Sequence, residues 1–340
     1  MFNITQMLFL MTLISGTLIS ISANSWLSAW MGLEINLLSF IPLMSNQKNS
    51  FSTEATLKYF LIQALASIIL LFSVITMQLY SQPHIFNNEL FDLLIASTLL
   101  LKMGAAPFHF WFPGVMEGLT WSNCLILMTW QKIAPLILTS YLLKDSIFFS
   151  MIVILSVIIG SLGGLNQTSL RKLMAYSSIN HLGWMLAAML SGENVWEFYF
   201  FIYTLLTSSL IFLFSSFQIF HINQSFLTLT GEKGLKFNLY LILLSLGGLP
   251  PFLGFLPKWM VIQTMTMMNF NFTITIMVVM TLITLFYYLR LSFSAFLMNF
   301  SQIKWYFKTS LNKQIFTVTT ILSSISTLGL LVITLTFNFI

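Results

Sequence analysis

Two stretches of this sequence interrupt long apolar segments with glycine and proline. Residues 99–113 read LLLKMGAAPFHFWFP, and residues 244–258 read LSLGGLPPFLGFLPK. Both fit the pattern G-x-x-P-F-x-x-x-x-P, which begins at Gly104 in the first stretch and at Gly248 in the second. Because proline removes a backbone N–H and clashes with the carbonyl one turn earlier, each pattern predicts a helix that is broken inside an apolar segment.

The sequence around these breaks has the composition of a membrane protein. Of its 340 residues, 57% are hydrophobic and 7% are charged, and the mean hydropathy is +0.90. Soluble proteins carry about 25% charged residues because their surfaces face water. The apolar runs reach about twenty residues, which is long enough for a helix to cross a hydrocarbon core of about 30 Å. The sequence therefore predicts an all-α polytopic membrane protein.

The charged residues are too scattered to form a binding patch for nucleic acid, although the formal net charge is +5. They are better explained as topology signals in loops and as functional groups inside the membrane. The N-terminal segment lacks the basic region of a cleaved signal peptide and is apolar almost from its first residue. We therefore expect it to form the first transmembrane helix.

Eleven apolar segments are predicted to cross the membrane. They cover residues 2–22, 25–44, 53–80, 90–112, 119–142, 147–166, 169–191, 197–221, 236–269, 273–299 and 316–338. With this count, the loops on the N-terminal side contain Lys48, Arg171, Lys172, Lys233, Lys236, Lys304, Lys308 and Lys313. The basic residue in the opposite loops is Lys144, beside Asp145. By the positive-inside rule, the N-terminus lies on the inner side and the C-terminus on the outer side.

The two broken spans occupy corresponding positions in an internal repeat. Each is the fourth helix of a five-helix group, residues 1–145 and 146–300, and residues 301–340 add a loop and a C-terminal helix. Because five is odd, the second group runs through the membrane inverted, and paired broken helices in inverted repeats indicate a transport site near the midplane. A packing kink is the alternative for a single proline, but a matched pair favours transport. The predicted break residues are Pro107, Pro250, Pro251 and Pro257.

Five ionisable side chains lie well inside the predicted spans: Glu34, Lys102, Lys132, Lys258 and His181. A charge at the bilayer centre costs about 2.5–3.5 kcal/mol on insertion scales, so such residues are expected to be functional. In general, a low-dielectric site lowers the pKa of a lysine, and a nearby carboxylate raises it again. We therefore interpret the glutamate and the three lysines as a proton relay. The histidine is either a further relay group or a satisfied structural residue.

The remaining polar residues are weaker candidates. Glu54 and Lys58 have the spacing of a local ion pair at a helix surface. Arg290 can extend its long side chain to the membrane surface and bind lipid headgroups there. The others follow the first break or lie at helix ends and in loops: His109, Trp111, Glu117, His84 and His221.

The sequence lacks the motifs of cofactor-binding proteins. It has no glycine-rich nucleotide loop and no cluster of cysteine, histidine and carboxylate residues with metal-ligand spacing. Its one cysteine, Cys124, excludes an internal disulfide and a cysteine-rich iron–sulfur site. We expect no nucleotide, flavin or metal in this chain, so that any redox chemistry belongs to its partners.

Several longer motifs run collinearly through the chain. They are WMGLEIN at 30–36, STEATLKYF at 52–60, LKMGAAPFHFW at 101–111, TWQKIAP at 129–135, GGLNQT at 163–168, LRK at 170–172, AYSSI at 175–179, SLGGLPP at 245–251 and GFLPKW at 254–259. This set resembles the antiporter-like chain 2 family of NADH:ubiquinone oxidoreductase, which is respiratory complex I. The resemblance covers about residues 2–338.

The resemblance implies a non-redox subunit in the proton-pumping membrane arm of an H⁺-translocating NADH:ubiquinone reductase. In that family the matched Glu34, Lys102, Lys132 and Lys258 lie on a hydrated polar axis, and quinone reduction elsewhere drives proton transfer along it. The resemblance also implies the mitochondrial inner membrane, with the N-terminus in the matrix and the C-terminus in the intermembrane space.

The resemblance further implies which molecules accompany the chain. Neighbouring antiporter-like chains, other membrane-arm subunits, accessory subunits and phospholipids such as cardiolipin would be its partners. NADH, FMN, iron–sulfur clusters and ubiquinone would be bound by other subunits. Bacterial relatives have fourteen helices, and this chain begins where their fourth would, so other subunits are expected to cover the flank that this exposes.

Two other functions use the same features. A stand-alone cation/proton antiporter of the same superfamily also needs broken helices and buried lysines, and the chain 2 motifs argue against it. A membrane scaffold would need apolar helix surface but no charges at the midplane, and it predicts that neutralising the buried lysines has no effect.

Overall fold

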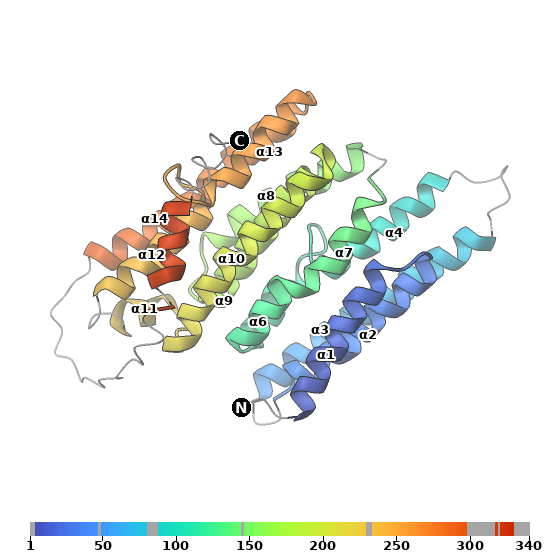
Figure 1. Ribbon diagram of the computed structural model, residues 1–340, viewed down its shortest axis with the longest axis horizontal. Coiled ribbons are helices and arrows are strands. Elements are labelled where there is room, and N and C mark those ends of the chain that lie inside the picture. Colours follow the sequence, from blue (N-terminus) through green and yellow to red (C-terminus); the bar gives the residue numbers. More distant parts are fainter. Residues whose placement is uncertain are drawn as a thin grey trace. The chain divides into compact units, whose positions relative to one another are not determined.

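Every regular element in the described part of the chain is a helix (Figure 1). The computed structural model describes residues 4–46, 49–79, 88–143, 146–228, 233–297, 317–318 and 320–329. The helices are α1 (Ile4–Ile21), α2 (Trp26–Met44), α3 (Ser50–Leu79), α4 (Asn88–Met103), α5 (Trp111–Gly118), α6 (Trp121–Met128), α7 (Trp130–Ser140), α8 (Ser146–Gly164), α9 (Leu170–Ser191), α10 (Glu193–Phe217), α11 (Ile222–Thr228), α12 (Lys233–Gly247), α13 (Phe255–Met267) and α14 (Asn271–Leu297). They form two compact units, residues 1–156 and 157–340.

Six of these helices are long and apolar enough to cross a membrane, namely α1, α2, α3, α8, α10 and α14. Their outward faces carry large apolar side chains, such as Met11 on α1 and Phe72 on α3, which are 71% and 63% exposed. Water does not favour such continuous apolar faces, whereas lipid does. The expectation of an all-helical, multi-pass membrane protein is confirmed.

The interruptions expected in the fourth and ninth spans are present. The fourth, predicted at 90–112, is divided into α4 and α5, and the ninth, predicted at 236–269, is divided into α12 and α13. In both cases a glycine with a positive φ follows the first helix, at 75° for Gly104 and 86° for Gly248. A side chain is strained in this conformation, so glycine is the residue expected where the chain leaves the helix.

The fifth span, predicted as one helix over 119–142, is also divided, and the prediction was wrong on this point. Helix α6 ends before Thr129, whose hydroxyl donates to the Leu125 carbonyl at 2.7 Å. The Lys132 N–H then bonds the Thr129 carbonyl at 3.2 Å, which tightens the turn. Pro135 lies inside α7 and has no backbone N–H, so the helical hydrogen bond to the Gln131 carbonyl, one turn earlier, cannot form.

Two segments expected to be connections are helical. Helix α5 continues to Gly118, beyond the predicted end of the fourth span at 112, and α11 lies in the predicted loop 222–235. Other predictions fall outside the described residues: those for Lys48, His84, Lys144, Asp145, Lys304, Lys308 and Lys313, and for much of the span 316–338.

In the first unit, α1, α2 and α3 lie side by side (Figure 1). Two glycines set the close approach of α1 and α2. A Cβ atom on Gly32 would stand 2.6 Å from the backbone nitrogen of Ser20 and 2.9 Å from the Gly16 carbonyl. Small residues at such a crossing allow two backbones to pack directly, as in other membrane helix pairs.

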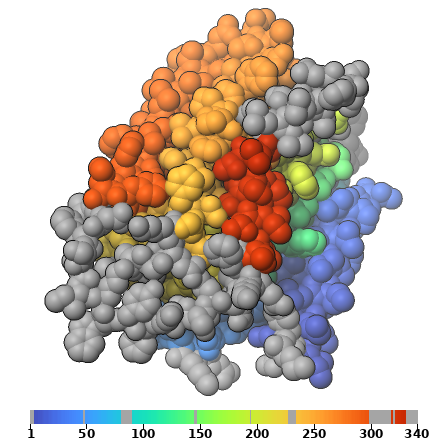
Figure 2. All heavy atoms as spheres, turned by 60° about the vertical axis from the view of Figure 1, so that its left-hand side comes forward, coloured from blue at the N-terminus to red at the C-terminus, as the bar shows by residue number. Residues whose placement is uncertain are grey.

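In the second unit, α9 is buried at almost every position from Leu173 to Met189, and it packs against α10, α13 and α14. A further apolar helix, Thr320–Gly329, lies against the second break. There the Leu253 N–H bonds the Ser326 carbonyl at 3.1 Å. Figure 2 shows this helix in red against the yellow and orange surface of the same unit.

Candidate functional site

At the first break, between α4 and α5, side chains donate hydrogen bonds to the backbone carbonyls that end α4. The Leu101 carbonyl accepts the indole N–H of Trp111 at 3.1 Å. The Lys102 carbonyl accepts the amide N–H of Gln63, on α3, at 3.2 Å. An interrupted helix inside a membrane is stable only when its released carbonyls find such partners. The end of α4 at this break is therefore stabilised by one contact from α3 and one from the first residue of α5.

Lys102 lies in the last turn of α4, directly before this break. Its side chain is buried and lies within electrostatic range of Glu34 on α2. The Oε2 atom of Glu34 is buried and has no hydrogen-bond partner within the described residues. A buried carboxylate oxygen needs a proton, a water or a cation beside it. The structure thus brings together two of the predicted relay residues.

A small cavity of about 20 Å³ adjoins Lys102. Three amide side chains line it: Asn36, Gln63 and Gln131. The Oδ1 atom of Asn36 accepts the side-chain N–H of Gln131 at 2.9 Å, which links α2 to α7. A polar cavity of this size has room for one water molecule, since about 10–15 Å³ suffices.

The sequence interpretation missed these three amides, because a neutral amide inside an apolar span is a weaker signal than a charge. Asn36 and Gln131 do stand within motifs that surround predicted relay residues, Glu34 and Lys132. That proximity is the signal that would have identified them.

Lys132 is the most completely buried of the predicted lysines, with 1% of its surface exposed. Its Nζ atom lies 5.2 Å from the centroid of the Phe112 ring, a cation–π distance. Its neighbours on α7, Gln131 and Pro135, line the cavity that contains Lys102. Three of the predicted relay groups are thus gathered in the first unit around α2, α4 and α7.

Lys258 lies in the first turn of α13, directly after the second break, which separates α12 from α13. Its ammonium donates to the Gly247 carbonyl at 2.8 Å and to the Leu246 carbonyl at 3.3 Å. These carbonyls end α12, where the helix dipole is negative and favours a cation. A Cβ atom on Gly248 would lie 3.0 Å from the Lys258 Nζ atom. Glycine here therefore leaves the space that the lysine occupies.

His181 lies on α9, and its Nδ1 atom is 2.9 Å from the Tyr199 hydroxyl. Its ring also packs 5.1 Å from the Tyr203 ring. Both tyrosines and the histidine line a cavity of about 10 Å³ whose other wall includes Gly254, at the end of the second break, and Pro257, in the first turn of α13. His181 is thus satisfied by a hydrogen bond and also faces the segment that holds the second-unit lysine.

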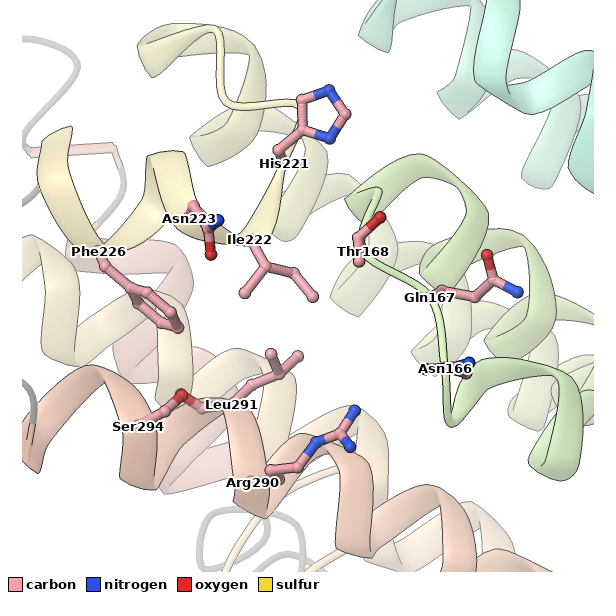
Figure 3. A pocket seen from close by; sticks show the side chains of 10 residues that line it. All are labelled: Asn166, Gln167, Thr168, His221, Ile222, Asn223, Phe226, Arg290, Leu291 and Ser294. Atoms are coloured by element: carbon pink, nitrogen blue, oxygen red, sulfur yellow. The ribbon is translucent and has the colours of Figure 1, made fainter.

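Two groups of weaker candidates lie at more peripheral positions, whereas Trp111 and His109 are buried at the first break. Lys58 and Glu54 form an exposed ion pair at 2.5 Å, as their spacing predicts. Arg290 donates to the Leu165 carbonyl at 2.6 Å. It lines a pocket of about 500 Å³ in the second unit. Figure 3 shows Arg290 on α14, and His221 on the far side of the same pocket.

Known proteins resemble this chain over most of its length. A protein-family profile described as NADH:quinone oxidoreductase/Mrp antiporter, TM, matches residues 23–284. NADH-ubiquinone oxidoreductase chain 2 of Anopheles gambiae is 56% identical over 335 residues, which are 98% of this chain and 98% of that relative.

Two solved structures have a similar fold. A chain of respiratory complex I from Thermus thermophilus has a TM-score of 0.84 at 24% identity, covering 97% of this chain and 79% of that chain. A chain of the Mrp complex from Dietzia sp. has a TM-score of 0.73 at 16% identity, covering 83% of this chain and 59% of that chain. At these identities the likeness establishes the fold. The profile match and the mosquito relative establish the family: this chain belongs to the NADH-ubiquinone oxidoreductase chain 2 family.

Proposed function

We propose that this chain is a proton-translocating subunit in the membrane arm of respiratory complex I. It couples quinone reduction elsewhere in the complex to proton transfer along buried glutamate and lysine residues. The observation that carries the proposal is the position of Lys102 and Lys258, each buried at a break in a helix. A charged group at such a place gains partners that an unbroken apolar helix cannot supply.

The relay in the first unit consists of Glu34, Lys102 and Lys132. A change in the charge at Glu34 alters the stability of the proton on Lys102, because the two groups interact electrostatically. The cavity beside Lys102 has room for a water that can hydrogen-bond Gln131, the neighbour of Lys132. This arrangement supports proton exchange between the two lysines.

The relay in the second unit consists of Lys258, with His181 as a further group. Protons that reach Lys258 pass toward the next antiporter-like subunit. Pro107 in the first break and Pro250 and Pro251 in the second prevent continuous helices. Pro257, also predicted as a break residue, lies instead in the first turn of α13, directly before Lys258. The matched breaks support two inverted five-helix repeats, residues 1–145 and 146–300, with eleven transmembrane helices in all.

The redox chemistry of the complex belongs to other subunits in this proposal. NADH, FMN, iron–sulfur clusters and ubiquinone are bound there. The support is in the sequence: a single cysteine, no glycine-rich nucleotide loop and no metal-ligand spacing. The chain contributes proton movement to the NADH:ubiquinone reductase reaction.

The chain lies in the mitochondrial inner membrane, with its N-terminus in the matrix and its C-terminus in the intermembrane space. The distribution of lysine and arginine in the loops supports this orientation. Neighbouring antiporter-like chains, other membrane-arm subunits, accessory subunits and phospholipids such as cardiolipin cover its outer faces. The exposed apolar residues of α1 and α3 supply such faces.

The test is neutralisation of the buried lysines in the assembled complex. Lys102→Ala and Lys258→Ala are each reconstituted into vesicles, and the protons moved per NADH oxidised are measured. The matched control is Lys58→Ala, which removes an exposed lysine and its surface ion pair. We expect fewer protons per NADH in the first two variants and no change in the control. Normal stoichiometry with full activity in both buried-lysine variants contradicts the proposal.

A stand-alone cation/proton antiporter is the second candidate, because the fold is shared with a chain of the Mrp complex. It predicts that the isolated chain exchanges Na⁺ for protons across a liposome membrane. The membrane-arm proposal predicts no such exchange, and it predicts that the chain copurifies with redox subunits.

A further inference from the structure

Four tyrosines on two helices of the second unit, both of which pack against α9, are buried in its apolar interior. Tyr199 and Tyr203 belong to α10, Tyr287 and Tyr288 belong to α14, and none is more than 2% exposed. A phenol hydroxyl inside a membrane protein is costly unless it is hydrogen-bonded. Four of them in one region therefore indicate a polar path through apolar surroundings.

The outer end of this path is the pocket of about 500 Å³. Several of its lining residues are exposed, including His221, Asn223 and Arg290, so the pocket opens at the surface of the unit. Figure 3 shows Arg290, Leu291 and Ser294 of α14 along one wall. The proposed orientation assigns this end of the unit to the matrix.

Tyr287 lies on α14 next to the part of the helix that lines this pocket. It precedes Leu291, a wall residue, by one helical turn on α14, so the two side chains share a face. Its ring packs against Gly164, where a Cβ atom would stand 2.9 Å from its Cε1 atom. Leu165, which follows Gly164, accepts a hydrogen bond from the Arg290 guanidinium on its carbonyl at 2.6 Å.

The middle of the path joins α14 to α9 and α10. The rings of Tyr287 and Tyr288 are 4.5 Å apart, and Tyr288 interacts with Ser177 of α9. Tyr203 interacts with Ser178, the next residue of α9, and lies within electrostatic range of Tyr288. The hydroxyls of Tyr287 and Tyr288 complete no well-aligned hydrogen bond within the described residues. They retain bonding capacity for water.

The inner end of the path is His181. It follows Ser177 and Ser178 by one turn of α9, bonds Tyr199 at 2.9 Å and faces the small cavity beside the second break. At about 1.5 Å per residue, it lies roughly 16 Å along α9 from Leu170. That is about half of a hydrocarbon core of about 30 Å. The path therefore runs from the surface to the midplane.

We propose that the hydroxyls of Tyr287, Tyr288, Ser177, Ser178 and Tyr203, completed by bound water, conduct protons between this pocket and His181. The inference rests on the proposed function and adds an access route to it. A hydroxyl accepts a proton on an oxygen lone pair and releases its own to the next acceptor, so each step breaks one O–H bond and forms another. His181 holds the proton at the inner end, beside the segment that contains Lys258.

The experiment removes one hydroxyl at a time and keeps the ring. Tyr288→Phe and Tyr203→Phe are compared with Tyr240→Phe in the assembled complex in vesicles. Tyr240 is also buried in the second unit, but its hydroxyl bonds Ser225 at 3.0 Å, and neither residue is a member of the proposed path. Protons pumped per NADH oxidised and the amount of assembled complex are measured, with Lys258→Ala as the reference for the relay.

We take the decrease in protons pumped per NADH in Lys258→Ala as the share that this chain contributes. We expect each path variant to lose at least about half of that share while assembling normally, and the Tyr240→Phe control to lose none. If both path variants pump like the control while Lys258→Ala is impaired, the path is wrong and the proposed function stands. If Lys102→Ala and Lys258→Ala both pump normally as well, the proposed function fails and the path with it. Should Tyr288→Phe not assemble, Ser177→Ala removes the adjacent hydroxyl with a smaller loss of volume and carries the same expectation.

Discussion

Lys258 donates its ammonium proton to the Gly247 carbonyl at 2.8 Å, so the lysine after the second break binds the end of the helix before it. The carbonyls at the end of α12 carry partial negative charge, which stabilises a cation more than a neutral amine. Release of a proton from Lys258 therefore weakens the bond that joins α12 to α13. The charge of the lysine and the geometry of the break are physically linked.

Replacement of Gly248 by alanine tests this link. Its φ of 86° disfavours any side chain by roughly 1–2 kcal/mol. The added Cβ atom would also stand 3.0 Å from the Nζ and Cδ atoms of Lys258. We expect Gly248→Ala to lower both the thermal inactivation temperature of the complex and its protons pumped per NADH.

The control for that variant is Gly234→Ala, at the start of α12. No atom lies within 4 Å of the position that an added Cβ atom would take there, and alanine favours a helix over glycine. This control should keep or slightly raise stability. Equal behaviour of the two variants would show that space at Gly248 does not matter to Lys258.

Replacement of Gln131 by leucine should expose the role of the amides in the first unit. It leaves the buried Asn36 Oδ1 atom without its 2.9 Å donor, which costs about 1–3 kcal/mol. The double variant Asn36→Leu/Gln131→Leu removes both partners and should recover most of that stability. It should not recover proton pumping, because neither of these amides remains to hold water beside Lys102. Thermal inactivation and protons per NADH, measured on the native complex and both variants, separate the two effects.

The indole of Trp111 should stabilise the first break. Trp111→Phe keeps an aromatic ring but removes the N–H that bonds the Leu101 carbonyl at 3.1 Å. The Leu101 carbonyl keeps its bond from the Gly104 N–H at 3.2 Å, so loss of the indole bond alone costs about 0.5–1.5 kcal/mol. We expect a lower thermal inactivation temperature than in Trp259→Phe, a change at a residue that is 54% exposed. A Trp111→Phe complex as stable as that control would argue that water satisfies the carbonyl instead.

The crossing of α1 and α2 should not tolerate larger residues. In Gly32→Ala the new methyl group meets backbone atoms of Ser20 and Gly16, which cannot rotate away. Overpacking of this kind costs about 1–3 kcal/mol, so the yield of assembled complex on a native gel should fall. Gly114→Ala, where no atom lies within 4 Å, should assemble normally.

Much of the fold could be predicted because its determinants are local. The expected span 169–191 corresponds to α9, Leu170–Ser191, and the expected span 25–44 corresponds to α2, Trp26–Met44. The length of an apolar segment determines whether its helix can cross the lipid, and this length is visible in the sequence itself. The division at Thr129 was missed because the apolar segment continues on both sides of this residue. Pro135 was its only signal in the sequence.

The candidate site was predictable in part for a similar reason. Lys102, Lys132 and Lys258 stand out because a charge within an apolar run is energetically expensive wherever the helices pack. Asn36 and Gln131 do not stand out, and they are bonded to each other although α2 and α7 are far apart in the chain. Such a pair exists only once two particular helix faces meet.

The sequence by itself determined that this chain lies in a membrane and that its helices break near Pro107 and Pro250. Transfer of apolar surface into lipid and the missing N–H of proline are properties of single residues and short segments. Only the tertiary structure decided that Lys258 binds Gly247 and that His181 faces the same break. Those contacts depend on how separate helices pack and on which buried polar atoms this packing brings together.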